Sequence, residues 1–399
     1  MTTSKDNPEK CTQWDKQTLV AHDCHDERHH GAVTMPMYQN SLFTFPTHEA
    51  FYEALDAPLQ HHLYTRGNNP TVNELECRLA LLEGGESARC FASGMAAISA
   101  SILSAVKAGD HVICVEYIYW PIRDFLENYL RRFGVETTFV HGENMAAIEA
   151  AVKPNTTLIF LESPTSMTFR LQDLQACAEL AKRIGATTII DNTWASPIYQ
   201  NPLQLGIDLV VHSLTKYVGG HSDIIGGVII GSKERLDRIG KEEFWLLGGI
   251  MTPQVASLAM RGLRTLPLRM EKLQQNGLQV ASFLEGLPFV ERVNHPGLTS
   301  HPQHELAERQ QSGYGSLFSF EAALSAEQIQ QWADGLDMFR IGLSWGGYES
   351  LVQVWRNTCE EDGKTLRLVR LYIGLEDPNL LIEDMKRSFA RIGLNCSEK

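Results

Sequence analysis

Short apolar runs alternate with amphipathic segments between residues 75 and 230 of the chain. The runs lie at residues 111–115, 158–161, 187–190, 209–211 and 228–230. Because these runs are continuously apolar, both faces of the sheet that they form should be covered. The segments between them, such as residues 171–184 with apolar positions at helical spacing, have the length of crossover helices. The pattern predicts an α/β unit with a mostly parallel sheet.

Polar, reactive or glycine residues follow the apolar runs. They lie at residues 116–119, 162–165, 191–194 and 212–216. Since ligands bind at the carboxyl ends of parallel strands, these segments should converge on one crevice. After a glycine-rich break near residues 248–253, a long helical stretch should lead into a smaller α+β domain.

The composition of the chain argues against several classes of partner and location. The chain has 399 residues, 43% of them hydrophobic, and its 35 basic against 48 acidic side chains give a net charge of −13. This charge argues against nucleic-acid and anionic-membrane partners. Residues 1–10 lack the apolar core of a signal peptide, and no apolar run is long enough to span a bilayer. We therefore expect a cytoplasmic protein.

Potential metal ligands and cysteines do not form a recognisable site. The eight cysteines are scattered without CxxC spacing, so we expect neither a disulfide framework nor a zinc ribbon. Residues 22–30, HDCHDERHH, hold many potential ligands, but their spacing fits no standard zinc pattern. We expect a solvated arm there and no metal.

The segment with the clearest chemistry is SLTKYVGGHSD at residues 213–223. It places Lys216 behind two hydroxyls, those of Ser213 and Thr215, and ahead of a glycine-rich turn. A lysine that forms a Schiff base with pyridoxal phosphate needs such a fixed backbone beside a phosphate anchor. Taken alone, the string is better explained as an exposed lysine in a turn.

Asp191 supports the Schiff-base interpretation. It follows the apolar run 187–190, so its carboxylate should emerge at the crevice and could meet a pyridinium nitrogen. The alternative is a helix N-cap. The spacing between Asp191 and Lys216 leaves room for one connecting segment and one strand, so neighbouring positions of the sheet should present both groups.

Other segments could complete a cofactor site, each with a structural alternative. The string SGMAA at residues 93–97 could bind an anion at a helix start, or be an ordinary capped helix. Tyr119 could stack on a flat ring and relay a proton through its hydroxyl, or simply pack. Arg66, near Tyr64 in a turn-rich loop, could take a phosphate. Arg370 interrupts an apolar run and could bind a substrate carboxylate or form a salt bridge.

Together these motifs resemble the Cys/Met metabolism family of fold-type-I pyridoxal-phosphate enzymes. The resemblance covers roughly residues 15–395. The strings YTR (64–66), SGMAA (93–97), ESP (162–164), DNT (191–193), SLTK (213–216) and GGHSD (219–223) occur in the family's order.

The resemblance implies an aspartate-aminotransferase-like fold with a large, mostly parallel seven-stranded sheet. It implies an N-terminal arm (1–60) that packs on a neighbouring subunit, a cofactor-binding α/β domain (61–252) and a C-terminal α+β domain (253–399). Lys216 would carry the cofactor, Asp191 would meet its ring nitrogen and Tyr119 would stack on the ring. Four residues would hold the phosphate: Gly94, Met95, Ser213 and Thr215.

The resemblance also implies a shared active site. Tyr64 and Arg66 would reach the cofactor phosphate of the adjacent subunit, and a homotetramer built as a pair of dimers is the family's usual state.

Within the family, SWGGYESL at residues 344–351 and RLYIGLED at residues 370–377 are most similar to bacterial cystathionine β-lyases. Synthases and γ-lyases tend to carry leucine where Trp345 stands, and Ser166 replaces an asparagine of many relatives. Ser344, Trp345 and Arg370, with Tyr119, would form the substrate site. Leu343 stands where a β-lyase has tyrosine, which leaves open whether cystathionine or another cysteine S-conjugate is cleaved.

The expected reaction is β-elimination. Lys216 would remove the α-proton as general base and the β-thiolate would leave, giving pyruvate, ammonia and a thiol. Two alternatives stay open: γ-elimination or γ-replacement on the same scaffold, and a non-catalytic protein that retains the cofactor.

Overall fold

The computed structural model describes residues 14–22, 29–355, 359–361 and 364–396. The expectation of a missing signal peptide at residues 1–10 falls outside this part of the chain. Residues 23–28 of the histidine-rich segment lie outside it as well, so the expectation about metal binding there stays a prediction.

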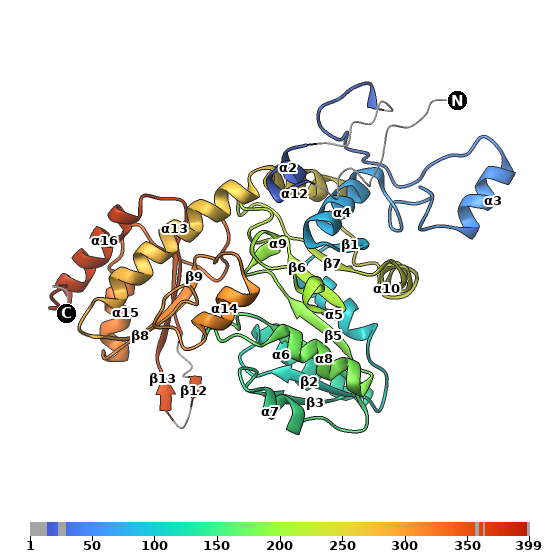
Figure 1. The fold of residues 1–399 in the computed structure, drawn as a ribbon. Coiled ribbons are helices and arrows are strands. Elements are labelled where there is room, and N and C mark those ends of the chain that lie inside the picture. Colours follow the sequence, from blue (N-terminus) through green and yellow to red (C-terminus); the bar gives the residue numbers. More distant parts are fainter. Residues whose placement is uncertain (1–13, 23–28, 356–358, 362–363, 397–399) are drawn as a thin grey trace.

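A seven-stranded sheet forms the centre of the larger unit (Figure 1). Its strands follow the order β1-β7-β6-β5-β4-β2-β3. Only β7 runs antiparallel to its neighbours β1 and β6. The predicted mostly parallel sheet is confirmed. The strands are β1 (Ser87–Phe91), β2 (His111–Val115), β3 (Glu136–Val140), β4 (Thr156–Glu162), β5 (Thr187–Asp191), β6 (Leu209–Ser213) and β7 (Gly227–Gly231).

Helices cover both faces of this sheet, as the continuous apolar runs predicted. Ile229 of β7 packs in a core with α5 (Gly94–Leu103), α8 (Leu174–Ile184) and α10 (Lys233–Ile239). Its neighbours Val228 and Ile230 pack on the opposite face, in a second core with α4 (Pro70–Glu83) and α12 (Pro253–Arg264). Shorter helical segments complete the unit: α6 (Trp120–Asp124), η2 (Phe125–Tyr129), η3 (Leu130–Phe133), α7 (Met145–Ala150), α9 (Ser196–Tyr199), η4 (Pro202–Leu205), η5 (Gly240–Phe244) and α11 (Trp245–Leu247).

Helix α8 begins three residues later than the periodicity suggested. Its N-cap is Asp173, whose side chain accepts a hydrogen bond from the Ala176 N–H group, and Gly185 ends the helix in the left-handed region. The capping residues therefore set the boundaries more closely than the apolar spacing does.

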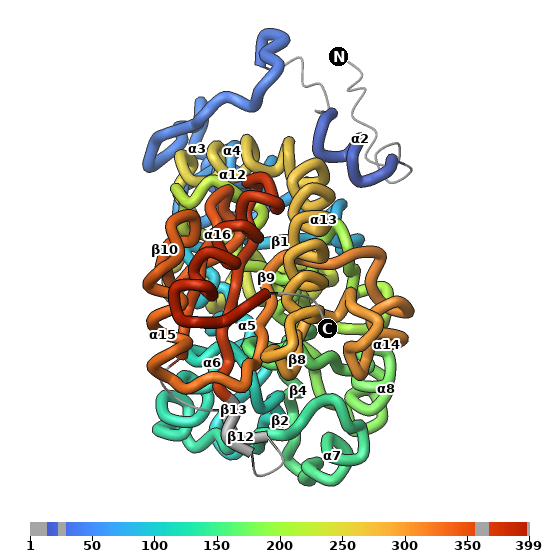
Figure 2. The backbone as a smooth tube through the Cα atoms, turned by 90° about the vertical axis from the view of Figure 1, so that its left-hand side faces the viewer, coloured from blue at the N-terminus to red at the C-terminus, as the bar shows by residue number. Residues whose placement is uncertain are grey.

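The C-terminal part of the chain builds a smaller α+β unit on the long helix α13 (Leu266–Glu285), which packs against α16 (Pro378–Arg391) and lies toward the viewer in Figure 2. Its five-stranded sheet has the order β10-β11-β14-β9-β8 and is antiparallel apart from the β10–β11 pair. The strands are β8 (Val290–Asn294), β9 (Leu317–Ala322), β10 (Arg340–Ile341), β11 (Leu351–Val354) and β14 (Leu368–Tyr372). The helices are α14 (His304–Gln310), α15 (Ala326–Asp334) and α16 (Pro378–Arg391), and β12 (Cys359–Glu361) pairs with β13 (Lys364–Leu366).

Within the N-terminal segment, α2 (Lys16–Ala21) packs against α4, α12 and α13, whereas α3 (His48–Asp56) extends away from the body of the molecule (Figure 1). The segment leaves several large apolar side chains open to solvent: Val33, Met37, Leu42, Phe51, Tyr52 and Leu55. The described helices include none with the length and apolar character needed to cross a membrane. The division at residues 60 and 252 remains a prediction.

Candidate active site

Lys216 lies in a tight loop directly after β6. The Gly219 N–H group donates to the Leu214 carbonyl and the Gly220 N–H group donates to the Lys216 carbonyl, which closes the loop on itself. From α13, the Arg269 guanidinium donates to the Tyr217 carbonyl at 2.6 Å. The lysine is therefore presented on a backbone that both units of the molecule hold in place.

The side chain of Lys216 points at the C-terminal unit. Its Nζ donates a hydrogen bond of 2.8 Å to Ser344 Oγ and lies 5.5 Å from the centroid of the Trp345 ring. Burial, aided by the positive charge of Arg370, lowers the pKa of Lys216 to about 8, while Asp191 opposes this shift. Near neutral pH the amine is thus neutral far more often than that of an ordinary lysine, and so is better able to act as a base.

The loop of residues 343–349 packs directly on the lysine loop. Gly346 has a φ of +90°, and a Cβ added to it would lie 2.8 Å from Lys216 Cα and from the Tyr217 nitrogen. Further along, Ser222 Oγ donates to Glu349 Oε1 at 2.6 Å. Only a glycine allows this approach, because any side chain at position 346 would strain its own backbone and press on Lys216.

Asp191 is the last residue of β5, at the carboxyl end of the sheet where it was predicted. Its carboxylate accepts hydrogen bonds from the N–H group and the hydroxyl of Thr193, and Thr193 Oγ1 also accepts from the Ser213 N–H group at 2.8 Å. Burial raises the pKa of Asp191, whereas the Thr193 hydrogen bonds and the charges of His212 and Lys216 lower it. Asp191 and Lys216 thus share one electrostatic environment.

Glu162 belongs to the same cluster, although no individual role was predicted for it. It ends β4 directly opposite Asp191 in the sheet register and accepts a hydrogen bond of 3.0 Å from the Tyr119 N–H group. Burial, and then the negative charge of Asp191, raise the pKa of Glu162 to about 8, against hydrogen bonds from Ser166 and Tyr119. The sequence does contain a signal for Glu162, because this residue, like Asp191, is a carboxylate that directly follows a buried apolar run.

Tyr119 stands at the start of α6, with its side chain 41% exposed. Burial raises the pKa of its hydroxyl, the charges of Asp191 and Glu162 raise it further, and Arg370 opposes them. The ring therefore lies among the charged groups of the crevice, as the strand-end pattern predicted.

Arg370 reaches the crevice from β14 of the smaller sheet. Its guanidinium donates to the Leu343 carbonyl at 2.6 Å, and burial lowers its pKa to about 10. Within the described residues it forms no ion pair, so the predicted salt bridge to an acid has no support there. The guanidinium remains a candidate ligand for an anionic substrate group.

The start of α5 and the end of β6 form a compact candidate cradle for an anion. Ser93 caps the helix by accepting from the Ala96 N–H group, and a Cβ added to Gly94 would lie 2.9 Å from Ser213 Oγ. The N–H groups of Gly94 and Met95, in the first turn of α5, have no intrahelical acceptor. They face a hydroxyl-bearing strand end, a suitable setting for a phosphate.

Thr215 lies one residue further along the lysine loop. Its Oγ1 accepts from the Gly226 N–H group at 3.1 Å and donates to the Gly226 carbonyl at 3.4 Å. The long second bond leaves its proton available to a stronger acceptor such as a phosphate oxygen.

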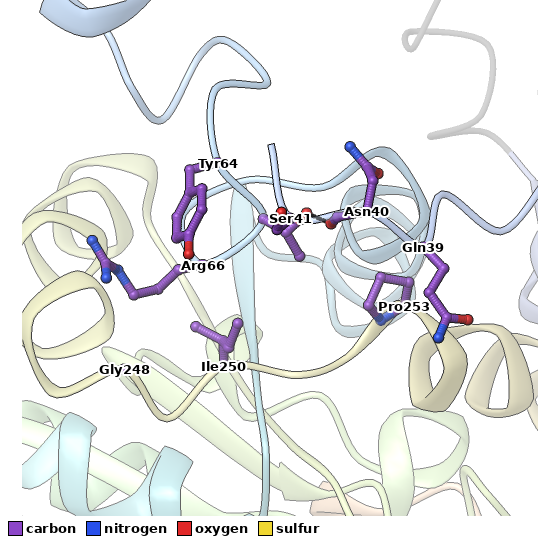
Figure 3. A pocket seen from close by; sticks show the side chains of 9 residues that line it. Gln39, Asn40, Ser41, Tyr64, Arg66, Gly248, Ile250 and Pro253 are labelled. Carbon is purple, nitrogen blue, oxygen red and sulfur yellow. Dashed lines mark hydrogen bonds between the residues drawn. The ribbon is translucent and has the colours of Figure 1, made fainter. Parts of the chain in front are cut away.

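Tyr64 and Arg66 lie in a different place. They line a separate open pocket, shown in Figure 3, together with Asn40 and Ile250, and neither Lys216 nor Asp191 contributes to its wall. The guanidinium of Arg66 lies 5.3 Å from the ring centroids of both Tyr64 and Trp245. The structure therefore brings together the other predicted site residues but leaves these two outside the lysine crevice.

Comparison with known proteins agrees with the fold and the motifs. The chain matches the family model described as Cys/Met metabolism PLP-dependent enzyme over residues 17–390. A cystathionine γ-lyase of Bacillus subtilis is 38% identical, covering 94% of this chain and 100% of the relative. An L-methionine γ-lyase of Pseudomonas putida is 38% identical over 93% of this chain and 96% of the relative. A putative cystathionine β-lyase of Rhizobium johnstonii is 37% identical over 94% of each.

Solved structures are similar over nearly the full length. The crystal structure of metB from Corynebacterium glutamicum superposes with a TM-score of 0.89 at 31% identity, covering 97% of this chain and 100% of that one. A putative O-acetylhomoserine (thiol)-lyase of Campylobacter jejuni, which contains a pyridoxyl-lysine phosphate, has a TM-score of 0.87 at 29% identity, covering 94% and 100%.

Proposed function

Because the chain belongs to the family of Cys/Met metabolism PLP-dependent enzymes, we propose that it is a carbon–sulfur β-lyase acting on cystathionine or a related cysteine S-conjugate. Its cofactor is pyridoxal 5′-phosphate, in common with the family.

The residues of the crevice fit this cofactor. The close approach of Gly94 to Ser213 makes a cradle that an added Cβ would fill, and a phosphate can there meet helix N–H groups and the Ser213 and Thr215 hydroxyls. Asp191 supplies a carboxylate for the ring nitrogen, and Tyr119 supplies an aromatic face. Lys216 supplies the amine, with a pKa of about 8.

When bound, pyridoxal phosphate supplies an electron sink for negative charge at the substrate α-carbon. In the proposed mechanism, Arg370 and Ser344 bind the substrate α-carboxylate and fix the α-carbon beside Lys216. The Lys216 amine takes the α-proton, and the hydrogen bond between Nζ and Ser344 Oγ holds the amine near that position. The thiolate then leaves from the β-carbon, and hydrolysis of the remaining fragment gives pyruvate and ammonia.

The observation that carries the choice of β-elimination is Trp345. Its indole packs edge-on against the buried ring of Tyr217, with centroids 5.2 Å apart, and so stands fixed beside Lys216 Nζ. A γ-elimination requires a further deprotonation, at the β-carbon. We propose that the rigid indole beside Nζ restricts the amine to the α-proton. A leucine at this position would leave the amine room to reach the β-carbon as well.

A second candidate is γ-elimination. It is favoured by the relatives, since cystathionine γ-lyase and methionine γ-lyases are as similar to this chain as the putative β-lyase is. Leu343, which is 61% exposed at the edge of the crevice, also differs from the tyrosine of a β-lyase.

The keto acid released from cystathionine distinguishes the two reactions. Purified enzyme with bound cofactor should release pyruvate and homocysteine, identified by chromatography and mass spectrometry. Release of 2-oxobutyrate and cysteine would instead establish γ-elimination. Lys216→Ala should lose turnover with cystathionine, cystine, methionine and O-acetylhomoserine alike, which shows that the measured activity belongs to this site.

We also propose a cytoplasmic enzyme that assembles as a homotetramer, a pair of dimers with shared active sites. This proposal is supported by Tyr64 and Arg66, which offer an aromatic ring and a guanidinium away from their own lysine crevice. The exposed apolar residues of the N-terminal arm support an interface between copies.

A further inference from the structure

Arg66 is exposed, yet its guanidinium is well ordered by its surroundings. Its turn is closed by the N–H groups of Gly67 and Asn68, both of which donate to the Tyr64 carbonyl. In the described part of the chain, Arg66 has no acidic partner. Its guanidinium instead lies 5.3 Å from each of two aromatic ring centroids, those of Tyr64 and Trp245. The N–H donors are thus oriented but not neutralised.

Trp245 reaches Arg66 because position 67 is a glycine. A Cβ added to Gly67 would lie 1.8 Å from Trp245 Cζ3 and 2.6 Å from Cε3. The six-membered ring of the indole therefore lies against the backbone of the turn, directly after Arg66.

The segment that carries the indole is anchored to the large sheet. The preceding residue, Phe244, is buried and packs edge-on against Phe91, with centroids 5.2 Å apart. Just beyond Trp245, the Gly249 carbonyl accepts from the Ala92 N–H group, and Ile250 bridges Phe91. Trp245 is thus anchored to the end of β1, immediately before the anion cradle at α5.

We propose that Trp245 is a positioning residue, which holds the Arg66 guanidinium ready to bind the cofactor phosphate in the active site of a second copy of this chain. The inference rests on the proposed sharing of active sites between subunits. Trp245 acts only through Arg66: the pinned indole reduces the number of orientations of a long side chain, so less conformational freedom is lost when the phosphate binds.

The test is the dissociation constant of pyridoxal phosphate, measured by absorbance titration of the full-length, cofactor-depleted enzyme. Trp245→Leu should raise this constant about tenfold, equivalent to about 1.4 kcal/mol. Trp245→Phe, which keeps a ring, should restore most of the affinity. Gly67→Ala should reproduce the loss with the tryptophan still present, because the added Cβ displaces the indole.

A double-mutant cycle separates positioning from a general structural effect. If Trp245 acts through Arg66, then Trp245→Leu should have little further effect in an Arg66→Ala background. Additive losses in the double variant would overturn the inference. The matched control is Tyr129→Leu, which removes a ring 5.3 Å from the guanidinium of Arg132, outside the pocket, and should leave cofactor affinity unchanged.

Two outcomes distinguish a failure of the proposed Arg66 anchor from a failure of the proposed role of Trp245. Should Arg66→Ala bind the cofactor as tightly as the native enzyme, the cross-subunit anchor itself is wrong, and the role of Trp245 falls with it. Should Arg66→Ala bind weakly while Trp245→Leu binds normally, the anchor stands and only the inference about Trp245 is wrong. Light scattering on each variant shows whether the oligomer is retained.

Discussion

At the scale of single residues, Lys216 is controlled by three competing effects. Burial and the charge of Arg370 disfavour its protonated form, and the carboxylate of Asp191 favours it. The first two prevail and bring the pKa from 10.5 to about 8. A base that must work near neutral pH needs such a balance, since a lysine with its ordinary pKa would be almost fully protonated there.

This balance predicts the pH dependence of Lys216 reactivity. In cofactor-depleted enzyme, the rate of acylation at Lys216 should rise with pH to a midpoint near 8, because only the neutral amine reacts. Arg370→Leu removes a nearby positive charge and should move the midpoint up, whereas Asp191→Asn removes a negative charge and should move it down. Peptide mass spectrometry measures both, with the exposed Lys182 as an internal reference. A midpoint that falls in Arg370→Leu would contradict this account.

The residues that could be predicted from the sequence are those whose role follows from their immediate neighbours along the chain. Lys216, Asp191 and Tyr119 each follow a buried strand, and the structure places them in one crevice. Glu162 met the same criterion and could have been found. Trp245 could not, because its significance depends on its approach to Gly67 and Arg66, which no sequence pattern records.

At the scale of elements, the fold was predictable where a strand is buried on both faces and is apolar without interruption. The runs that became β2, β4, β5, β6 and β7 are continuously apolar, and each is a strand. β3 was missed because it lies at the edge of the sheet, where residues 136–139 are partly or fully exposed and only Val140 is buried. The order of the strands could not be predicted from the sequence, because the insertion of antiparallel β7 between β1 and β6 depends on long-range pairing.

The close contact between α5 and β6 leads to a prediction about cofactor affinity. Gly94→Ala would place a Cβ 2.9 Å from Ser213 Cβ and Oγ, so the start of α5 must move away from the strand end. We expect cofactor affinity to fall at least tenfold, because the helix N–H groups and the hydroxyl would no longer converge on one phosphate. Absorbance titration measures the affinity.

A second crowded glycine serves as the control. A Cβ on Gly335, at the end of α15, would lie 2.7 Å from Ser388 Oγ in the smaller unit. Gly335→Ala should therefore lower the thermal midpoint of unfolding without a comparable loss of cofactor affinity. Equal losses of affinity in both variants would mean that crowding alone, and not the cradle, explains the effect of Gly94→Ala.

At the scale of the whole molecule, the candidate site is divided. The lysine crevice joins the large sheet to the loop of residues 343–349 and to Arg370, so both units of one chain contribute to it. Tyr64 and Arg66, by contrast, line a pocket of their own (Figure 3). The proposed sharing of active sites agrees with this division, since a second copy would supply the guanidinium.

Mixed oligomers test this division. Lys216→Ala and Arg66→Ala enzymes should each be impaired alone, but mixed dimers of the two should show about one half of the native activity, because one of their two sites is free of both substitutions. The measurement is lyase activity of mixed dimers isolated through two different affinity tags. If the isolated mixed dimers show no recovery, Arg66 and Lys216 serve the same chain.

The contact between Gly346 and the backbone of Lys216 also bears on how such an enzyme can diversify. The segment expected to choose the substrate rests on the segment that performs the chemistry, with 2.8 Å between the position of a Cβ and Lys216 Cα. Selection for a new substrate can therefore vary Leu343 and Trp345 while position 346 stays constrained. Recombination between relatives should succeed when residues 213–223 and 343–349 are inherited together, as a single module.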